Sequence, residues 1–302
     1  MKGWCGSNAD RISNLPRDVM QLILTFLPVK DAAKTATLSK QWRENWRANT
    51  QLVFDRDFSR MSKTELYALH SSKPLMLEIF KALLVPDGPI TKFELIIPGL
   101  KPCPDIMDLI VVYLSKKHVQ EFLLAFSHHL DDDGYPAIDG KFFASGNVPF
   151  ILPTLLHQLK AVQLESIVLY RLSEARVLVC LITSSPNLQN LSIWSSSAPG
   201  LPQTEAIDSL QLLLEADNHS TASCFQCLEE LRLDAILGNK VELDLLRFAL
   251  ATAPLLRRIY MKPAKELDSK KGHKFLKNVT QYKRASKEAE VIYNSDDEAD
   301  TL

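Results

Sequence analysis

An internal repeat constrains the fold of this chain more than any other feature. From residue 90 onward, the pattern apolar, two variable, apolar, one variable, apolar returns six times, with first residues 29, 40, 29, 40 and 28 positions apart. The last two apolar positions of each triple alternate with a variable residue, as in a β-strand. The triples are Ile90/Phe93/Leu95, Val119/Phe122/Leu124, Leu159/Val162/Leu164, Leu188/Leu191/Ile193, Leu228/Leu231/Leu233 and Leu256/Ile259/Met261.

The stretches between these predicted strands have helical spacing of their apolar residues. We expect helices over residues 104–116, 173–183, 205–216 and 241–253. A strand joined to a helix and repeated at such intervals predicts an irregular α/β leucine-rich-repeat-like solenoid, whose neighbouring units cover one another's apolar faces. A doubly wound α/β enzyme shows the same alternation. However, no Gly-rich phosphate loop or Gly-x-Ser-x-Gly motif follows a strand, and Gly totals only 10.

Residues 10–50 form a smaller unit with many apolar side chains for its length. We expect three short helices: one opened by Pro16, a second after Asp31, and a third with Trp42 and Trp46 on one face. A segment of about 40 residues buries too little of its surface to hide every apolar side chain, so some should contact a partner protein. These side chains are Leu15, Val19, Leu22, Ile23, Phe26, Leu27, Val29, Leu38, Trp42 and Trp46.

This segment resembles the F-box. The resemblance lies in Leu15-Pro16, Ile23, Leu27, residues 29–32, Leu38-Ser39, Trp42-Arg43 and Trp46, whereas Gln41 replaces the basic residue that often precedes the Trp. F-box proteins dock this unit onto the Skp adaptor of SCF-type cullin-RING ubiquitin ligases, so the resemblance implies a substrate receptor rather than an enzyme. It also implies adaptor contacts, with Leu38 and Trp42 divided between the adaptor and internal packing. The implied contacts are Leu15, Pro16, Val19, Ile23, Leu27, Leu38 and Trp42.

The rest of the chain resembles the leucine-rich-repeat region of plant F-box proteins, in particular those that end in an FBD segment. Residues 50–55, 88–93, 227–233, 242–243 and 253–256 carry this resemblance. The expected fold class is α+β multi-domain, a three-helix F-box followed by the irregular solenoid. The expected domains are an F-box at 8–52, a linker or capping helical segment at 53–89, irregular leucine-rich repeats at 90–223, FBD-like terminal repeats at 224–293 and a disordered acidic tail at 294–302.

Composition and motifs limit the partners, the location and the kinds of binding site that we expect for this chain. With 46% hydrophobic residues and a net charge of −1, the chain can bury a sizeable core and should have no dominant polyanionic partner. Its apolar stretches are shorter than the roughly 20 residues of a membrane span. No signal-peptide core opens the chain, which predicts the nucleus or cytoplasm and free thiols. Cys224 and Cys227 lack a second pair, and residues 128–133 (HHLDDD) read as a polar loop, so we expect no metal or cofactor.

The two longer repeat intervals place extra chain at residues 127–150 and 195–223, at one edge of the predicted sheet. Loops held by a rigid scaffold commonly bind partners, so we expect an unknown protein target here. Candidate contacts are His128, His129, Asp131, Tyr135, Phe142 and Phe143 on the first loop and Trp194 on the strand that enters the second. In the alternative interpretation, which we favour for the phenylalanines, Phe142, Phe143 and Phe150 cover the solenoid flank and Trp194 lies in the core.

Eleven Lys and Arg between residues 257 and 287 precede an acidic cluster at 296–300, with few aromatic residues interleaved, among them Phe275 and Tyr282, so nucleic-acid binding is not expected. Taken with the resemblance, the sequence predicts the substrate-recognition subunit of an SCF-type E3 ubiquitin ligase without a catalytic residue of its own. Two alternatives stay open. One is an adaptor-binding scaffold that recruits no substrate for degradation, and the other is a ligand-dependent receptor of the same architecture.

Overall fold

The computed structural model of the chain describes residues 12–13, 15–55, 58, 73–96, 103–125, 152, 154–169, 172–196, 224–265 and 267–294. Three helices come first: α1 (Arg17–Phe26), α2 (Val29–Thr35) and α3 (Lys40–Arg47). The strands are β1 (Gln51–Phe54), β2 (Lys92–Ile96), β3 (Glu121–Ala125), β4 (Ala161–Ile167), β5 (Asn190–Ser195), β6 (Glu230–Ile236), β7 (Arg258–Pro263) and β8 (Glu290–Tyr293). The helices among them are α6 (Lys73–Leu83), α7 (Pro104–Leu114), α8 (Leu172–Ser184), α10 (Lys240–Thr252) and α11 (Ser269–Thr280).

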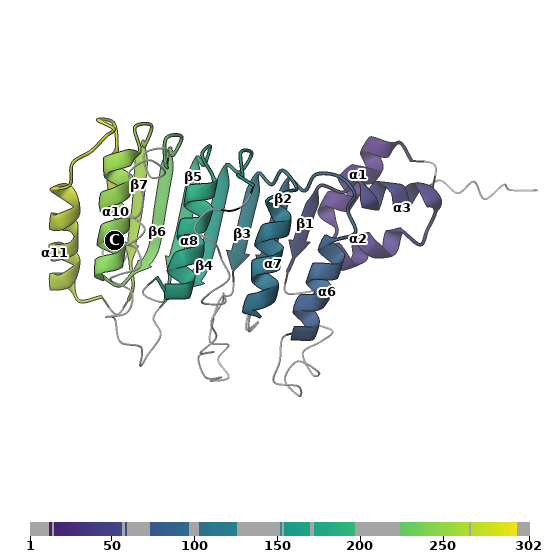
Figure 1. The fold of residues 1–302 in the computed structure, drawn as a ribbon, viewed down its shortest axis with the longest axis horizontal. Coiled ribbons are helices and arrows are strands. Elements are labelled where there is room, and N and C mark those ends of the chain that lie inside the picture. The colour runs from purple at the N-terminus through teal and green to yellow at the C-terminus, as the bar shows by residue number, and fades with distance from the viewer. Residues whose placement is uncertain are drawn as a thin grey trace, which may run out of the picture.

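The eight described strands form one open parallel sheet in which strand order follows chain order, from β1 to β8. Parallel strands need crossover connections, and right-handed crossovers that all step in one direction place their helices on the same face. Figure 1 shows α6, α7, α8, α10 and α11 in a row along the sheet, with α1, α2 and α3 at one end and α11 at the other. The opposite face, which we call the open face, carries none of the described helices.

The main core lies between the sheet and the helix row. Every member of the six apolar triples is buried, with at most 4% of its surface exposed. Because the strands lie in register, equivalent positions form continuous rows; Phe93 pairs with Phe122, and Phe122 pairs with Val162. The rings of Phe93 and Phe122 stack with 5.8 Å between their centroids. The six predicted strands are therefore confirmed, in a mixed helix and strand protein with an open parallel sheet.

The predicted helices and boundaries agree with the structure in part. Helices α7, α8 and α10 coincide with three predicted helices, and the fourth, at 205–216, lies outside the described residues, as does the predicted tail apart from Asn294. Strands β1 and β8 were not predicted, because the first position of the triple is polar there, Asn49 before β1 and Glu288 before β8. The predicted boundary between the F-box and the linker falls inside β1.

A buried glutamate fastens strand β6 to helix α10. The carboxylate of Glu242 accepts the backbone N–H groups of Gly238 (2.8 Å), Leu237 (3.1 Å) and Asn239 (3.1 Å). Burial raises the pKa of Glu242, and these N–H bonds oppose the rise. Glu174 on α8 is also fully buried, and it accepts the N–H that follows β4 at 2.6 Å. Both carboxylates therefore satisfy backbone donors where a strand turns into the next helix.

The burial of the apolar rows leads to a prediction for the stability of the fold. Leu231 on β6 is fully buried, so we expect Leu231→Ala to lower the free energy of unfolding by about 2–5 kcal/mol through lost burial and the cavity left behind. Urea denaturation followed by circular dichroism measures this. The control Leu255→Ala, at a side chain that is 54% exposed, should change stability by less than about 0.5 kcal/mol. Equal effects of the two variants would contradict this assignment of the core.

Asp108 on α7 is a buried carboxyl. The residue is 9% exposed, and neither carboxylate oxygen has a hydrogen-bond partner among the residues that the structure describes. Burial, with a smaller contribution from the charge of Asp105, raises the pKa of Asp108 to about 6 from its ordinary value of 3.8. Between these two pH values the folded chain holds a proton that the unfolded chain has released, so the stability contributed by Asp108 falls as the pH rises through this window.

This carboxyl predicts a pH-dependent stability. The free energy of unfolding of the wild type, relative to Asp108→Asn, should fall by up to about 3 kcal/mol between pH 4 and pH 8, because the ionised carboxylate is buried without compensation. Urea denaturation at a series of pH values measures the difference. The control Asp105→Asn, at an exposed position, should keep most of the wild-type pH dependence. A pH dependence that survives in Asp108→Asn would assign it to other groups.

Candidate functional site

Helix α1 carries apolar side chains on two faces. Met20 and Leu24, one turn apart, are buried. Val19, Leu22 and Phe26 lie on the outer face with helical spacing and are 40%, 57% and 79% exposed. The outer face of an ordinary surface helix is polar. The outer face of α1 is therefore suited to contact another protein.

The predicted adaptor contacts divide by exposure. The exposed contacts are Pro16, Val19 and Leu38, the half-buried ones are Leu15, Ile23 and Leu27, and the buried one is Trp42. Sequence reasoning did not place Leu22, Phe26 or Ile12 among the contacts, although helical spacing from Val19 points to Leu22 and Phe26. We call the exposed apolar side chains of this module the outer apolar set: Ile12, Pro16, Val19, Leu22, Phe26 and Leu38.

Trp42 holds α3 against the segment that precedes α1. Only 2% of Trp42 is exposed, and its indole Nε1 donates a hydrogen bond to the carbonyl of Ile12 at 3.2 Å. The side-chain amide of Gln41 donates to the carbonyl of Leu15, also at 3.2 Å. Ser39 caps α3 by accepting the backbone N–H of Trp42. The structure thus places Trp42 in internal packing and gives Gln41 a role in holding the same segment.

Helix α2 begins at Val29, earlier than the predicted start after Asp31. Pro28 precedes it with a φ of −53°, close to the helical value, and a proline at this position breaks no helical hydrogen bond. Asp31 then lies in the first turn, where its negative charge interacts favourably with the helix dipole. The proline, rather than the aspartate, therefore sets the helix start.

The helical module joins the sheet directly. The side chain of Asn49 donates to the carbonyl of Gln51 at 2.8 Å and accepts its N–H at 3.3 Å. The N–H of Thr91 donates to the carbonyl of Thr50 at 2.7 Å, so pairing with the β2 segment starts where the module ends. Helix α2 also contacts β1. These bonds fix the module to the first strand of the sheet.

The open face differs between its two halves. On β2 to β4 the alternating outward positions include three carboxylates, Glu94, Glu121 and Glu165, and one ammonium, Lys92. A hydrogen bond to Glu94, in an ion pair of 2.9 Å, raises the pKa of Lys92, with a smaller contribution from Glu121 at 3.7 Å. On β5 to β7 the outward side chains include aromatic and cationic groups: Trp194, Arg232, Arg258, Tyr260 and Lys262.

Comparison with known proteins shows which proteins this chain is similar to. A model of the F-box domain matches residues 12–49, the segment that contains α1, α2 and α3. An Arabidopsis thaliana F-box/FBD/LRR-repeat protein is 34% identical over 119 residues, which cover 39% of this chain and 28% of the relative. The chain therefore contains an F-box domain and is similar to plant F-box/FBD/LRR-repeat proteins.

Two further relatives extend the likeness of this F-box protein. An F-box/LRR-repeat protein of Arabidopsis thaliana is 26% identical over 227 residues, 72% of this chain and 71% of the relative. An FBD-associated F-box protein of the same plant is 31% identical over 120 residues, 40% of this chain and 28% of the relative. The chain thus spans less than a third of the length of the first and last of these three relatives. No solved structure matches it significantly.

Of the predicted target contacts of the F-box protein, the structure describes only Trp194. His128, His129, Asp131 and Tyr135 lie outside the described residues, together with residues 142–143 and 150. Trp194 on β5 is 47% exposed, so the alternative interpretation that Trp194 is a core residue is wrong. The reason is its register: the buried positions of β5 are Leu191, Ile193 and Ser195, and Trp194 alternates with them.

Within the described part of the F-box protein, Cys224 and Cys227 belong to no cluster that could hold a metal. Burial raises the pKa of the Cys224 thiol to about 11, which disfavours the reactive thiolate. The sulfur of Cys227 lies 3.9 Å from Oδ1 of Asn187. Across the described ranges, no group of three or more His, Cys, Asp and Glu side chains has the proximity that a metal site needs.

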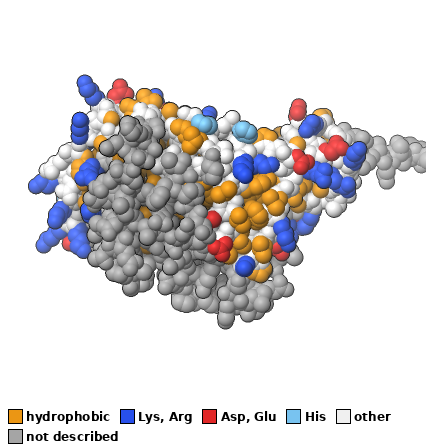
Figure 2. Space-filling model, in the orientation of Figure 1, with side chains coloured by type: hydrophobic (Ala, Val, Ile, Leu, Met, Phe, Trp, Pro, Cys, Tyr) orange, Lys and Arg blue, Asp and Glu red, His pale blue; other side chains and the backbone are white. Residues whose placement is uncertain are grey.

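The end of the F-box protein at α11 is basic. Figure 2 shows Lys and Arg side chains gathered at this end, at the left of the view, and Lys270, Lys271, Lys274 and Lys277 of α11 are all exposed. Phe275, one of the aromatic residues in the basic run, is 2% exposed and packs in the core. It is therefore not available to stack on a base. None of the described helices has the length and apolar character to cross a membrane.

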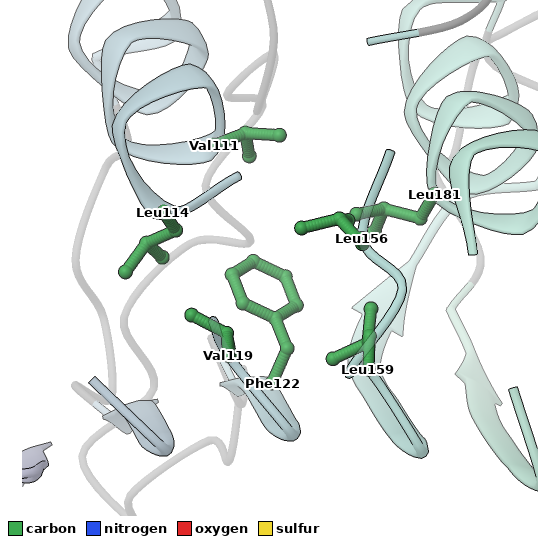
Figure 3. A pocket seen from close by; sticks show the side chains of 7 residues that line it. All are labelled: Val111, Leu114, Val119, Phe122, Leu156, Leu159 and Leu181. Atoms are coloured by element: carbon green, nitrogen blue, oxygen red, sulfur yellow. The ribbon is translucent and has the colours of Figure 1, made fainter. Parts of the chain in front are cut away.

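One apolar gap lies between α7, β3 and α8. Figure 3 shows the side chains that line it, which point toward one another. Its volume of about 10 Å³ is that of a single water. The lining has no polar side chain to orient a ligand, so this gap is a packing defect rather than a ligand site. The lining residues are Val111, Leu114, Val119, Phe122, Leu156, Leu159 and Leu181.

The packing of Trp42 leads to a prediction for the isolated F-box protein. Trp42→Phe removes the bond to the Ile12 carbonyl and leaves a gap, so it should lower the free energy of unfolding by about 1–3 kcal/mol. Thermal and urea denaturation measure this. The matched control Trp194→Phe, at a 47% exposed position, should cost less than about 1 kcal/mol. If the two substitutions destabilise equally, Trp42 does not anchor the module.

Proposed function

We propose that this F-box protein is the substrate-recognition subunit of an SCF-type E3 ubiquitin ligase. The observation that carries the proposal is the exposed apolar face of α1, Val19, Leu22 and Phe26, inside the matched F-box. Burying such a side chain fully contributes about 1.5–3 kcal/mol. A Skp-type adaptor that covered this face, together with Pro16 and Leu38, would gain much of that free energy.

We infer further that the sheet and helix row form an irregular leucine-rich-repeat-like arc. The support is the strand order, which follows the chain, and the recurrent buried triple, which gives each unit one strand. Stacked units of this kind present an extended face for binding. In the proposal the open face and its adjoining loops bind a protein target.

The proposed mechanism is proximity. The F-box binds the adaptor, and through it the cullin-RING assembly, while the arc binds the target. The partner enzyme that carries ubiquitin supplies the covalent chemistry. Because the bonds at Asn49 and Thr50 join the F-box to β1, the fold itself sets the position of the open face relative to the adaptor.

The outer apolar set gives the decisive test. We expect Phe26→Asp to weaken binding to a purified Skp-type adaptor at least about tenfold, because it puts a charge into an apolar interface. Binding is measured by surface plasmon resonance, with folding checked by circular dichroism. The matched control Leu109→Asp, at a leucine on α7 that is 53% exposed, should bind like the wild type. A wild type that fails to bind, or a Phe26→Asp variant that binds equally well, refutes the proposal.

A further inference from the structure

The open face of β5, β6 and β7 contains a small aromatic and cationic patch. The parallel register aligns Ser192, Arg232 and Tyr260 in one row, and it pairs Trp194 with Asp234 in the next. Successive residues along a row are about 5 Å apart. Side chains from three neighbouring strands therefore lie on one surface. We call Trp194, Arg232 and Tyr260 the open-face patch.

Trp194 gives this patch an apolar surface. It is 47% exposed, whereas Trp42 and Trp46 are 2% and 4% exposed. Tryptophan is strongly enriched among the residues that dominate binding energies, because one ring buries a large area at a small cost in conformational entropy. A tryptophan on an open sheet face is thus suited to cover an apolar side chain of a partner.

Arg232 gives the patch a positive charge whose motion is restricted. Its guanidinium lies 5.0 Å from the centroid of the Tyr260 ring, which restricts its motion. Arg258 lies 5.9 Å from the same ring and forms an ion pair with Glu230. No ion pair of Arg232 occurs among the described residues. The donors of Arg232 are therefore available to a partner.

The local charge indicates which anion fits. Arg258 pairs with Glu230, whereas the guanidinium of Arg232 forms no ion pair with a described carboxylate. Burial raises the pKa of Asp234, and the charges of Arg232 and Lys262 oppose the rise, which places both cations near it. One guanidinium matches one carboxylate, because its N–H groups can form two parallel hydrogen bonds to it. A phosphate group carries about −1.5 to −2 and would overcompensate the patch.

We propose that the open-face patch binds an Asp or Glu side chain of a protein target, with the carboxylate on Arg232 and a neighbouring large apolar side chain on Trp194. This rests on the proposed function, because it names the chemistry of the target. The other half of the open face supports the choice. Three carboxylates accompany one ammonium on β2 to β4, so an acidic segment is repelled there and favoured at β5 to β7.

The test is a positional-scanning library of immobilised ten-residue peptides, probed with the full chain. The library fixes Glu, Asp, Gln, phosphoserine, Lys, Leu, Phe or Ala at each position. The wild type should prefer Glu or Asp over Gln by about tenfold at one position, with large apolar residues preferred beside it. Arg232→Gln should lose the acidic preference. Trp194→Ala should lose the apolar preference and keep the acidic one.

Arg247→Gln is the matched control. Arg247 lies on α10 in the helix row, its side chain is 60% exposed, and it lies 3.6 Å from Asp244. This variant should select peptides as the wild type does. The inference is overturned if the wild type shows no acidic preference, if Arg232→Gln retains it, or if phosphoserine is preferred over Glu.

The same preparations are tested for adaptor binding, which separates the two proposals. If the wild type binds the adaptor and selects no acidic peptide, the patch has no such role and the proposed function stands. If it fails to bind the adaptor but shows an acidic preference that depends on Arg232, the proposed function fails and the binding site stands. All variants should retain the wild-type circular dichroism spectrum.

Discussion

The burial of the apolar triples between the sheet and the helix row is the interaction on which the rest of the structure depends. Each triple places its side chains against helices and against the equivalent triples of neighbouring strands. A single strand and helix would leave most of this surface in water, so the units are stable only together. The same packing keeps the strands in register, and this register aligns the side chains of the open face.

The helical module serves the sheet as well as its proposed partner. Without it, β1 would present an open strand edge, which is a site for unwanted pairing. Helix α2 contacts β1, and Asn49 and Thr50 bond across the junction. The inner faces of the module thus contribute to the fold, while the outer face of α1 keeps Leu22 and Phe26 exposed. This division explains why so short a segment holds so many apolar residues.

The sequence was sufficient to predict the elements whose apolar residues follow the period of a strand or a helix. The six strands with a full triple were predictable, and so were α7, α8 and α10, because period reports which side of an element is buried. Strands β1 and β8 were missed because the first position of the triple is polar there, Asn49 and Glu288. The predicted start of α2 is wrong because the helix begins directly after Pro28, before Asp31. Trp194 was a candidate contact with a core position as the alternative, and its register in β5 leaves it exposed.

By itself, the sequence determined that this chain has a partner-seeking helical module followed by repeating strands and helices, because apolar spacing and helix signals are local. Only the tertiary structure decided which apolar residues of that module stay exposed and that Trp42 is not one of them. It also decided that Arg232, Tyr260 and Trp194 lie on the same part of the open face, since they come from different strands. Such neighbours depend on the lateral register between strands, which a single sequence does not state.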